Sequence, residues 1–250
     1  MSEMLRLDRF LAECGTGSRK QAVSIIKAGR VRVEGAVVFE PGLKISEDSD
    51  VTLDGNKLQY EKYSYFMLNK PKGCVSAVKD KLSDTVIEYL KGVNARGLFP
   101  VGRLDKDTEG FLLITNDGEL CHALISPSKH VEKTYYVICD KRLPRNARSL
   151  FKKGIDIGDD SPCLPAELKT LKAVDEGMSY YLTITEGRFH QIKRMFYALG
   201  SKVIYLKRIS IGGVKLDPGL GKGEFRALTR EELMLLKNGP SDNETDEVDS

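Results

Sequence analysis

The 250-residue sequence has no tryptophan, few histidines and cysteines, and no long apolar run. Its closest two cysteines, Cys121 and Cys139, are too far apart for a C-x-x-C half-site, which disfavours a metal-dependent mechanism. No segment approaches the roughly 20 apolar residues of a transmembrane helix. The N-terminus also lacks the basic and apolar stretches of a secretory signal. These absences, with scattered thiols typical of a reducing compartment, predict a cytoplasmic protein.

Charge is unevenly distributed along the chain. Residues 241–250 hold five acids and no base, so residues 1–240 carry 39 basic residues against the remaining 31 acidic ones, a net charge of +8. The acidic segment 241–250 has no apolar periodicity and is predicted to be a disordered tail. The basic remainder favours a polyanionic partner.

The first 60 residues predict a small unit of two helices on short strands. Apolar residues repeat at i, i+3, i+4 and i+7 from Leu7 to Cys14, as on one face of a helix. Ser18 and Gln21 form a capping-box pattern for a second helix, and Gly29 stands where that helix would end. Positions 19–32 contain five basic residues and no acidic one. Such a basic segment could bind a phosphate backbone, although a helix face exposed only to solvent can have the same charge pattern. These bases are Arg19, Lys20, Lys27, Arg30 and Arg32.

Residues 61–240 predict a second, larger unit. The apolar patterns predict strands at 65–69, 110–115, 135–138, 180–184 and 203–211, and helices at 83–91, 118–125, 144–153, 192–199 and after Thr229. Strands outnumber helices without strict alternation. The pattern therefore favours an α+β fold with a mixed, mostly antiparallel sheet flanked by helices.

Three polar stretches of the larger unit have compositions that suit chemistry. In the first, Gly102–Gly110, a carboxylate close to a guanidinium would stay ionised and could act as a nucleophile, although an ion-paired surface turn has the same composition. In the second, strand alternation places Lys133 and Tyr135 on one face, which suits stacking on a flat base but is also usual for half-buried sheet tyrosines. The third, Glu186–Met195, begins the most basic region of the chain.

Two sets of motifs resemble known families. Arg6–Leu11, Ser18–Ala22 and Lys27–Gly35 resemble the S4 RNA-binding domain. This resemblance implies contact with structured RNA through the second helix and the strand that follows it.

The motifs of the larger unit resemble the pseudouridine synthases, in the branch typified by ribosomal small-subunit pseudouridine synthase A. The matching motifs are Gly102–Asp105, Glu132–Tyr135 and His190–Met195, and the resemblance extends over residues 3–237. It implies isomerisation of a uridine to pseudouridine in small-subunit (16S) ribosomal RNA, a reaction that needs no cofactor and no metal.

The resemblance also implies roles for individual residues. Asp105 would be the nucleophile, Lys193 its ionic partner, and Tyr135 the ring that stacks on the detached uracil. Arg103 would fill the space that the flipped uridine leaves. The other residues predicted to contact RNA are Lys133, Arg188, His190, Gln191 and Arg194.

Other functions stay open from the sequence. Large-subunit (23S) synthases of the same branch usually have Asn-Arg where this chain has Phe189-His190. A non-catalytic RNA-binding or ribosome-assembly protein is a further alternative, against which the presence of Asp105 and Tyr135 argues. An aspartyl phosphotransferase would need an acidic metal site and a glycine-rich phosphate loop, and the sequence has neither. The predicted partner is small-subunit ribosomal RNA, either naked or in an assembling particle. The protein is expected to bind it as a monomer and not to associate with a membrane.

Overall fold

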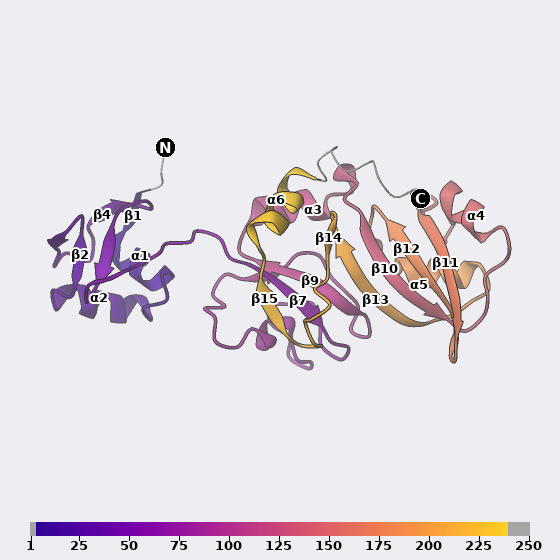
Figure 1. The fold of residues 1–250 in the computed structure, drawn as a ribbon, viewed down its shortest axis with the longest axis horizontal. Helices are drawn as coiled ribbons and strands as arrows, with labels where there is room; N and C mark the ends of the chain where they lie inside the picture. The colour runs from indigo at the N-terminus through magenta and orange to yellow at the C-terminus, as the bar shows by residue number, and fades with distance from the viewer. Residues whose placement is uncertain (1–3, 240–250) are drawn as a thin grey trace, which may run out of the picture. The chain divides into compact units, whose positions relative to one another are not determined.

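The computed structural model describes residues 4–239, and the chain divides into two compact units between Tyr63 and Ser64 (Figure 1). The sequence pattern predicts this division near residue 60. The predicted disordered tail, 241–250, lies outside the described residues. No helix within residues 4–239 combines the length and apolar character needed to cross a bilayer.

The N-terminal unit contains the two predicted helices, α1 (Leu7–Glu13) and α2 (Arg19–Lys27). Ser18 caps α2 in a capping box with Gln21, as the sequence predicts, and Gly29 follows α2 with a left-handed φ of 71°. The strands form a sheet in the order β3-β2-β5-β6 and a separate pair, β1-β4. Their bounds are β1 Met4–Arg6, β2 Val31–Val33, β3 Ala36–Val37, β4 Lys44–Ser46, β5 Val51–Leu53 and β6 Asn56–Lys57.

The larger unit is built on one sheet with the strand order β11-β12-β10-β13-β9-β7-β15, to which β14 and β8 add at β13 and β9. Among these strands only β9 and β13 pair in parallel, so the predicted mixed, mostly antiparallel α+β fold is confirmed. The bounds are β7 Tyr65–Lys70, β8 Phe99–Pro100, β9 Glu109–Thr115, β10 Lys133–Cys139, β11 Glu167–Val174, β12 Gly177–Ile184, β13 Val203–Ile211, β14 Val214–Lys215 and β15 Phe225–Ala227.

Helices cover different parts of the two faces of this sheet. On one face, α4 (Ala147–Lys153) and α5 (Gln191–Ala198) pack through Phe151 and Phe196 against Tyr180 of β12. On the other, α3 (Gly118–Ile125) and α6 (Arg230–Asn238) belong to a cluster with side chains of β7, β9 and β14. In Figure 1, α5 lies behind the strands β10 to β13.

Several elements differ from the sequence prediction. The short strands β1, β4, β8, β14 and β15 and the 3-10 turn η2 (Pro127–Lys129) were not predicted, and two longer segments also differ. The helix expected over 83–91 is only a 3-10 turn, η1 (Val86–Tyr89): it begins with a Thr85–Glu88 capping box, but Gly92, with a φ of 83°, follows within a few residues. Strand β11 was not predicted. It is an edge strand whose exposed positions and irregular register between Thr170 and Ala173 hide the two-residue alternation.

Candidate active site

A buried lysine fixes the loop that carries Asp105. Lys70, at the end of β7, is fully buried, and its Nζ donates hydrogen bonds to the carbonyl oxygens of Pro71 (3.0 Å), Asp105 (3.1 Å) and Thr108 (2.9 Å). The backbone N–H of Thr108 also donates to the Asp105 carbonyl at 3.1 Å, which closes a turn. Burial lowers the pKa of Lys70. This role was not predicted from the sequence, because the residue looks like the polar end of a strand.

Lys193, on the first turns of α5, neutralises two carboxylates of this loop. Its Nζ lies 2.9 Å from Oδ2 of Asp105 and 2.6 Å from Oδ1 of Asp107. Burial alone would lower the pKa of Lys193, but the bonds and charges of Asp107 and Asp105 outweigh burial and raise it. Burial would likewise raise the pKa of Asp107, but the bond from Lys193 lowers it. The structure thus brings Asp105 and Lys193 together and adds Asp107, for which the sequence predicted no role.

An aromatic pair precedes α5 beside the same carboxylate. His190 has a left-handed φ of 49° and stands at the N-cap of α5. Its Nε2 lies 3.6 Å from Oδ1 of Asp105. The rings of Phe189 and His190 stack with centroids 3.8 Å apart, and Phe189 is 72% exposed. The large exposed apolar ring of Phe189 is available for contact with a flat ligand.

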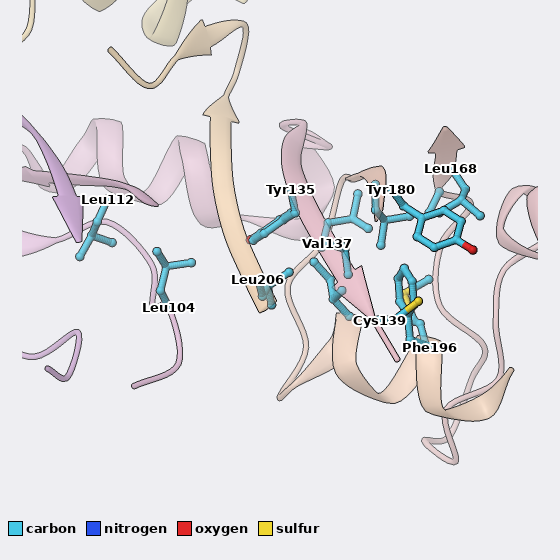
Figure 2. Packing of buried hydrophobic residues seen from close by; sticks show 14 of the residues in the cluster. Leu104, Leu112, Tyr135, Val137, Cys139, Leu168, Tyr180, Phe196 and Leu206 are labelled. Atoms are coloured by element: carbon cyan, nitrogen blue, oxygen red, sulfur yellow. The ribbon is translucent and has the colours of Figure 1, made fainter. Parts of the chain in front are cut away.

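A small cavity of about 80 Å³ opens beside Asp105. Its polar lining includes Lys193 and the exposed Arg103, and its apolar lining comes from Leu104, Ile184, Ile192 and Leu206. Tyr135 of β10, only 7% exposed, forms part of the wall, and Figure 2 shows it within the buried apolar cluster. A carboxylate that pairs with a lysine at the wall of an apolar cavity can act as a nucleophile or a base.

Other hollows differ in what they offer. A wider one of about 550 Å³ reaches Asp105 and is also lined by Lys72 and Lys106, two bases that were not predicted to contact RNA. A larger depression of about 760 Å³ lies between α4 and the ends of β11 and β12, and neither Asp105 nor Lys193 lines it. Of these three hollows, the small cavity is the one lined by both the ion-paired carboxylate and Tyr135, which makes it the candidate site.

Two of the predicted RNA-contacting residues hold the loop before α5. Arg188 donates from Nε to Glu186 (3.0 Å) and from its two Nη atoms to the carbonyl oxygens of Ser161 (2.6 Å) and Pro162 (2.8 Å). Buried Gln191 donates to Glu186 at 2.8 Å and accepts from the Arg188 backbone N–H at 2.9 Å. Their side chains therefore fix the loop on which His190 stands.

Arg194 and Lys133 also have partners within the protein. Arg194 donates to the carbonyl oxygen of Ile157 at 2.7 Å and pairs with Asp159 at 2.5 Å. Lys133 donates to the carbonyl oxygen of Val131 at 2.8 Å. Burial, with a smaller effect of a nearby positive charge, lowers the pKa of Lys133 to about 8. Of the predicted RNA-contacting residues in this unit, Arg103 and His190 are the exposed ones.

The five bases of the N-terminal unit are not equivalent. Arg19 pairs with Asp8 at 3.1 Å, Arg30 pairs with Asp54, and Arg32 donates to a backbone carbonyl at 2.9 Å. Lys20 and Lys27 are exposed, and neither side chain makes an ion pair or hydrogen bond among residues 4–239. Within that part of the chain, no group of three or more His, Cys, Asp or Glu side chains is arranged to hold a metal ion.

Comparisons with known proteins agree on one kind of relative. Residues 64–198 match the family described as RNA pseudouridylate synthase, and residues 5–51 match the S4 domain. An uncharacterised RNA pseudouridine synthase of Bacillus subtilis, YtzG, is 46% identical and aligns over 93% of this chain and 98% of its own length. Ribosomal small subunit pseudouridine synthase A of Escherichia coli K12 is 40% identical over 92% of this chain and 98% of its own. A crystal structure of a pseudouridylate synthase, 40% identical, covers 93% of this chain and 99% of its own with a TM-score of 0.65.

Proposed function

This chain belongs to the RNA pseudouridylate synthase family, and we propose that it isomerises a uridine of small-subunit (16S) ribosomal RNA with Asp105 as the nucleophile. It is an RNA uridine-to-pseudouridine isomerase with an N-terminal S4 domain. The observation that carries the assignment of Asp105 is its ion pair with Lys193 at the wall of the tyrosine-lined cavity.

The reaction breaks the N1–C1′ bond of a uridine, turns the uracil and joins it to the ribose through C5, from which a proton leaves. An attacking carboxylate must be ionised. Lys193 supplies the positive charge at 2.9 Å, and Asp107 on its other side keeps the lysine cationic. The positive charge of Lys193 therefore faces Asp105, which is positioned by a loop that Lys70 holds through its carbonyl oxygens.

Tyr135 and Arg103 complete the proposed site. The ring of Tyr135 is buried at the cavity wall, where it would stack on the detached uracil, and its hydroxyl would assist removal of the C5 proton. A uridine within a helix must leave the stack to reach Asp105, at a cost of a few kcal/mol. Arg103, exposed beside Asp105, would occupy the vacated space, and the Phe189–His190 stack would contact a neighbouring base.

The choice of small-subunit ribosomal RNA rests on two observations. The relatives named for small-subunit RNA align over nearly the whole chain, and the third motif contains Phe189-His190 rather than Asn-Arg.

Lys72 and Lys106, on the wide hollow beside Asp105, provide positive charge for the phosphates around the target. We propose that the enzyme acts as a monomer in the cytoplasm, where this RNA is its partner.

Mapping pseudouridines in ribosomal RNA of cells with and without this protein tests the proposal. One small-subunit uridine is expected to stay unmodified in the deletion strain, and the parent protein but not Asp105→Asn should restore the modification. Asp175→Asn, which alters an exposed carboxylate in the β11–β12 turn, is the matched control and should restore it. A site lost from large-subunit RNA would transfer the substrate assignment to that RNA. Restoration by Asp105→Asn would remove Asp105 from its role.

The same strains provide a second measurement. Incubation of the purified parent protein with naked small-subunit RNA, or with assembling particles from the deletion strain, shows which form is modified. Modification of particles alone would place the enzyme in ribosome assembly.

A further inference from the structure

Four side chains form a row across one face of the sheet. Tyr136 of β10 pairs directly with Tyr181 of β12 on one side and with Lys207 of β13 on the other. Tyr181 in turn pairs with Lys169 of β11. Direct partners in antiparallel strands project from the same face of a sheet. The row therefore reads lysine, tyrosine, tyrosine, lysine across four adjacent strands.

This row lies on the face opposite to the candidate active site. Successive residues of a strand point to opposite faces, so Tyr136 points away from the cavity that Tyr135 lines. Helices α4 and α5 pack on the Tyr135 face, and α5 is seen behind these strands in Figure 1. Helices α3 and α6 cluster with β7, β9 and β14 instead. Within residues 4–239 no helix packs over the row, and Tyr181 is 36% exposed.

The rings are held in place by their neighbours. The Tyr136 ring makes edge contacts with Tyr181 (centroids 5.9 Å apart, 62° between planes) and with Tyr205 (6.1 Å, 66°). The hydroxyl of Tyr205 donates to Glu109 at 2.8 Å, and Lys222 pairs with the same carboxylate at 2.8 Å. Because Glu109 is only 2% exposed and is paired, it adds little negative charge to the surface.

We infer that this face binds an unpaired segment of RNA, with Tyr136 and Tyr181 each stacking on one base and the flanking lysines contacting phosphates. Neighbouring strands are about 4.8 Å apart, so rings on adjacent strands can receive adjacent bases. Aromatic side chains on an open sheet with basic residues around them are a general way of binding single-stranded RNA. Neither the Lys169 nor the Lys207 side chain donates a hydrogen bond among residues 4–239. Lys169 is exposed, whereas Lys207 is half-buried and its positive charge also acts on buried Glu109, with which Lys222 pairs. Glu167, two residues before Lys169, is an exposed acid near the row.

The inference deepens the proposed function, since it rests on an RNA substrate, and it is tested by binding alone. The probe is a fluorescein-labelled oligouridylate of about 15 nucleotides, titrated with the full-length protein by fluorescence anisotropy. Tyr136→Leu and Tyr181→Leu, which keep apolar bulk but lose the π face, should each weaken binding about tenfold. The Tyr136→Phe and Tyr181→Phe variants should bind like the parent protein. Tyr197→Leu, which changes a 78% exposed tyrosine on α5, is the matched control and should also bind like the parent.

The lysines give an independent readout. Lys169→Gln and Lys207→Gln should each reduce the slope of log affinity against log salt concentration by roughly 0.7. Unchanged affinity in both leucine variants, with folding verified by circular dichroism, would overturn the inference, as would equal losses in the leucine and phenylalanine variants. Pseudouridine mapping detects a failure of the proposed function independently. In that case the parent protein would leave small-subunit RNA unmodified, regardless of how it binds the oligonucleotide.

Discussion

At the scale of single residues, the site depends on one cation shared by two carboxylates. The Nζ of Lys193 contacts Asp105 and Asp107 at 2.9 and 2.6 Å. Without that cation, the two carboxylates would lose the positive charge they share, and the bond that lowers the pKa of Asp107 would be absent. Lys193 therefore stabilises the charge on which the proposed chemistry depends.

We expect Lys193→Met to reduce the rate of isomerisation by about a hundredfold, a loss comparable to removal of one electrostatic contact in other active sites. Lys193→Arg keeps the charge and should retain most of the rate. The measurement is single-turnover release of tritium from small-subunit RNA labelled at C5 of uracil. Full activity of the methionine variant across pH 6 to 8 would contradict the role of the ion pair.

Lys133 leads to a pH-dependent prediction about stability. Burial lowers its pKa from 10.5 in the unfolded chain to about 8 in the fold. Between these values the unfolded chain binds more protons than the folded chain, so the free energy of unfolding rises with pH. Relative to Lys133→Met, the parent protein should gain roughly 1–3 kcal/mol between pH 8 and pH 10.5. Urea unfolding of both proteins at pH 8 and pH 10.5 measures the free energy of unfolding. An equal change with pH in the parent protein and in Lys133→Met would show that the titration of Lys133 does not affect stability.

At the scale of elements, the loop that carries Asp105 is held by the buried side chain of Lys70, which donates to its carbonyl groups. The Nζ of Lys70 bonds the carbonyl oxygens of Asp105 and Thr108 at 3.1 and 2.9 Å. Helix α5 contributes in a similar way, since Gln191 and Arg188 hold the loop before it through Glu186. The loop that carries Asp105 and the loop before α5 are thus each held by buried hydrogen bonds, and together they bring Asp105 and Lys193 into contact.

We expect Lys70→Met to lower the free energy of unfolding by about 2–4 kcal/mol, because buried carbonyl groups would lose their donor. The rate at saturating RNA should also fall, since the loop that carries Asp105 would loosen. Thermal unfolding and single-turnover kinetics measure the two effects. Lys79→Met, an exposed lysine of the same unit, is the control and should change neither. A stable Lys70→Met variant with the parent rate would show that the loop holds its own shape.

At the scale of the whole molecule, the proposed chemistry lies in the larger unit alone, whereas the proposed RNA contacts lie in both units. Asp105, Tyr135 and Lys193 belong to the larger unit, whereas the basic segment 19–32 belongs to the unit that matches the S4 domain. Within that segment, Arg19 and Arg30 are paired with aspartates. Lys20 and Lys27 are the better candidates for phosphate contacts.

We expect Lys20→Ala and Lys27→Ala to weaken binding of small-subunit RNA and to reduce the log–log salt slope by roughly 0.7 to 0.9 for each phosphate that is no longer neutralised. KM should rise while the rate at saturating RNA is retained, because the chemical groups lie in the other unit. Binding titrations at several salt concentrations provide the measurement. An unchanged slope in the double variant would mean that this basic face is only solvated.

Local sequence patterns were sufficient to predict most of the helices and the family. Helix α2 begins at the Ser18 capping box and α6 at that of Thr229, as their spacing predicts. The three motifs in the larger unit and the pattern of the first 60 residues indicated the family that the comparisons then identified. Such signals are readable because caps, turns and helix faces depend on residues only a few positions apart.

Contacts between distant segments, in contrast, become visible only in the folded chain. The second carboxylate on Lys193, the contact of Lys70 with the loop and the row from Lys169 to Lys207 all join segments far apart in the chain. The edge strand β11 and the short 3-10 turn η1 were not predicted correctly either. Strand β11 depends on pairing with β12, and η1 is followed closely by the turn at Gly92. Strand register and burial fix such contacts, and both arise from packing of the whole sheet rather than from local sequence.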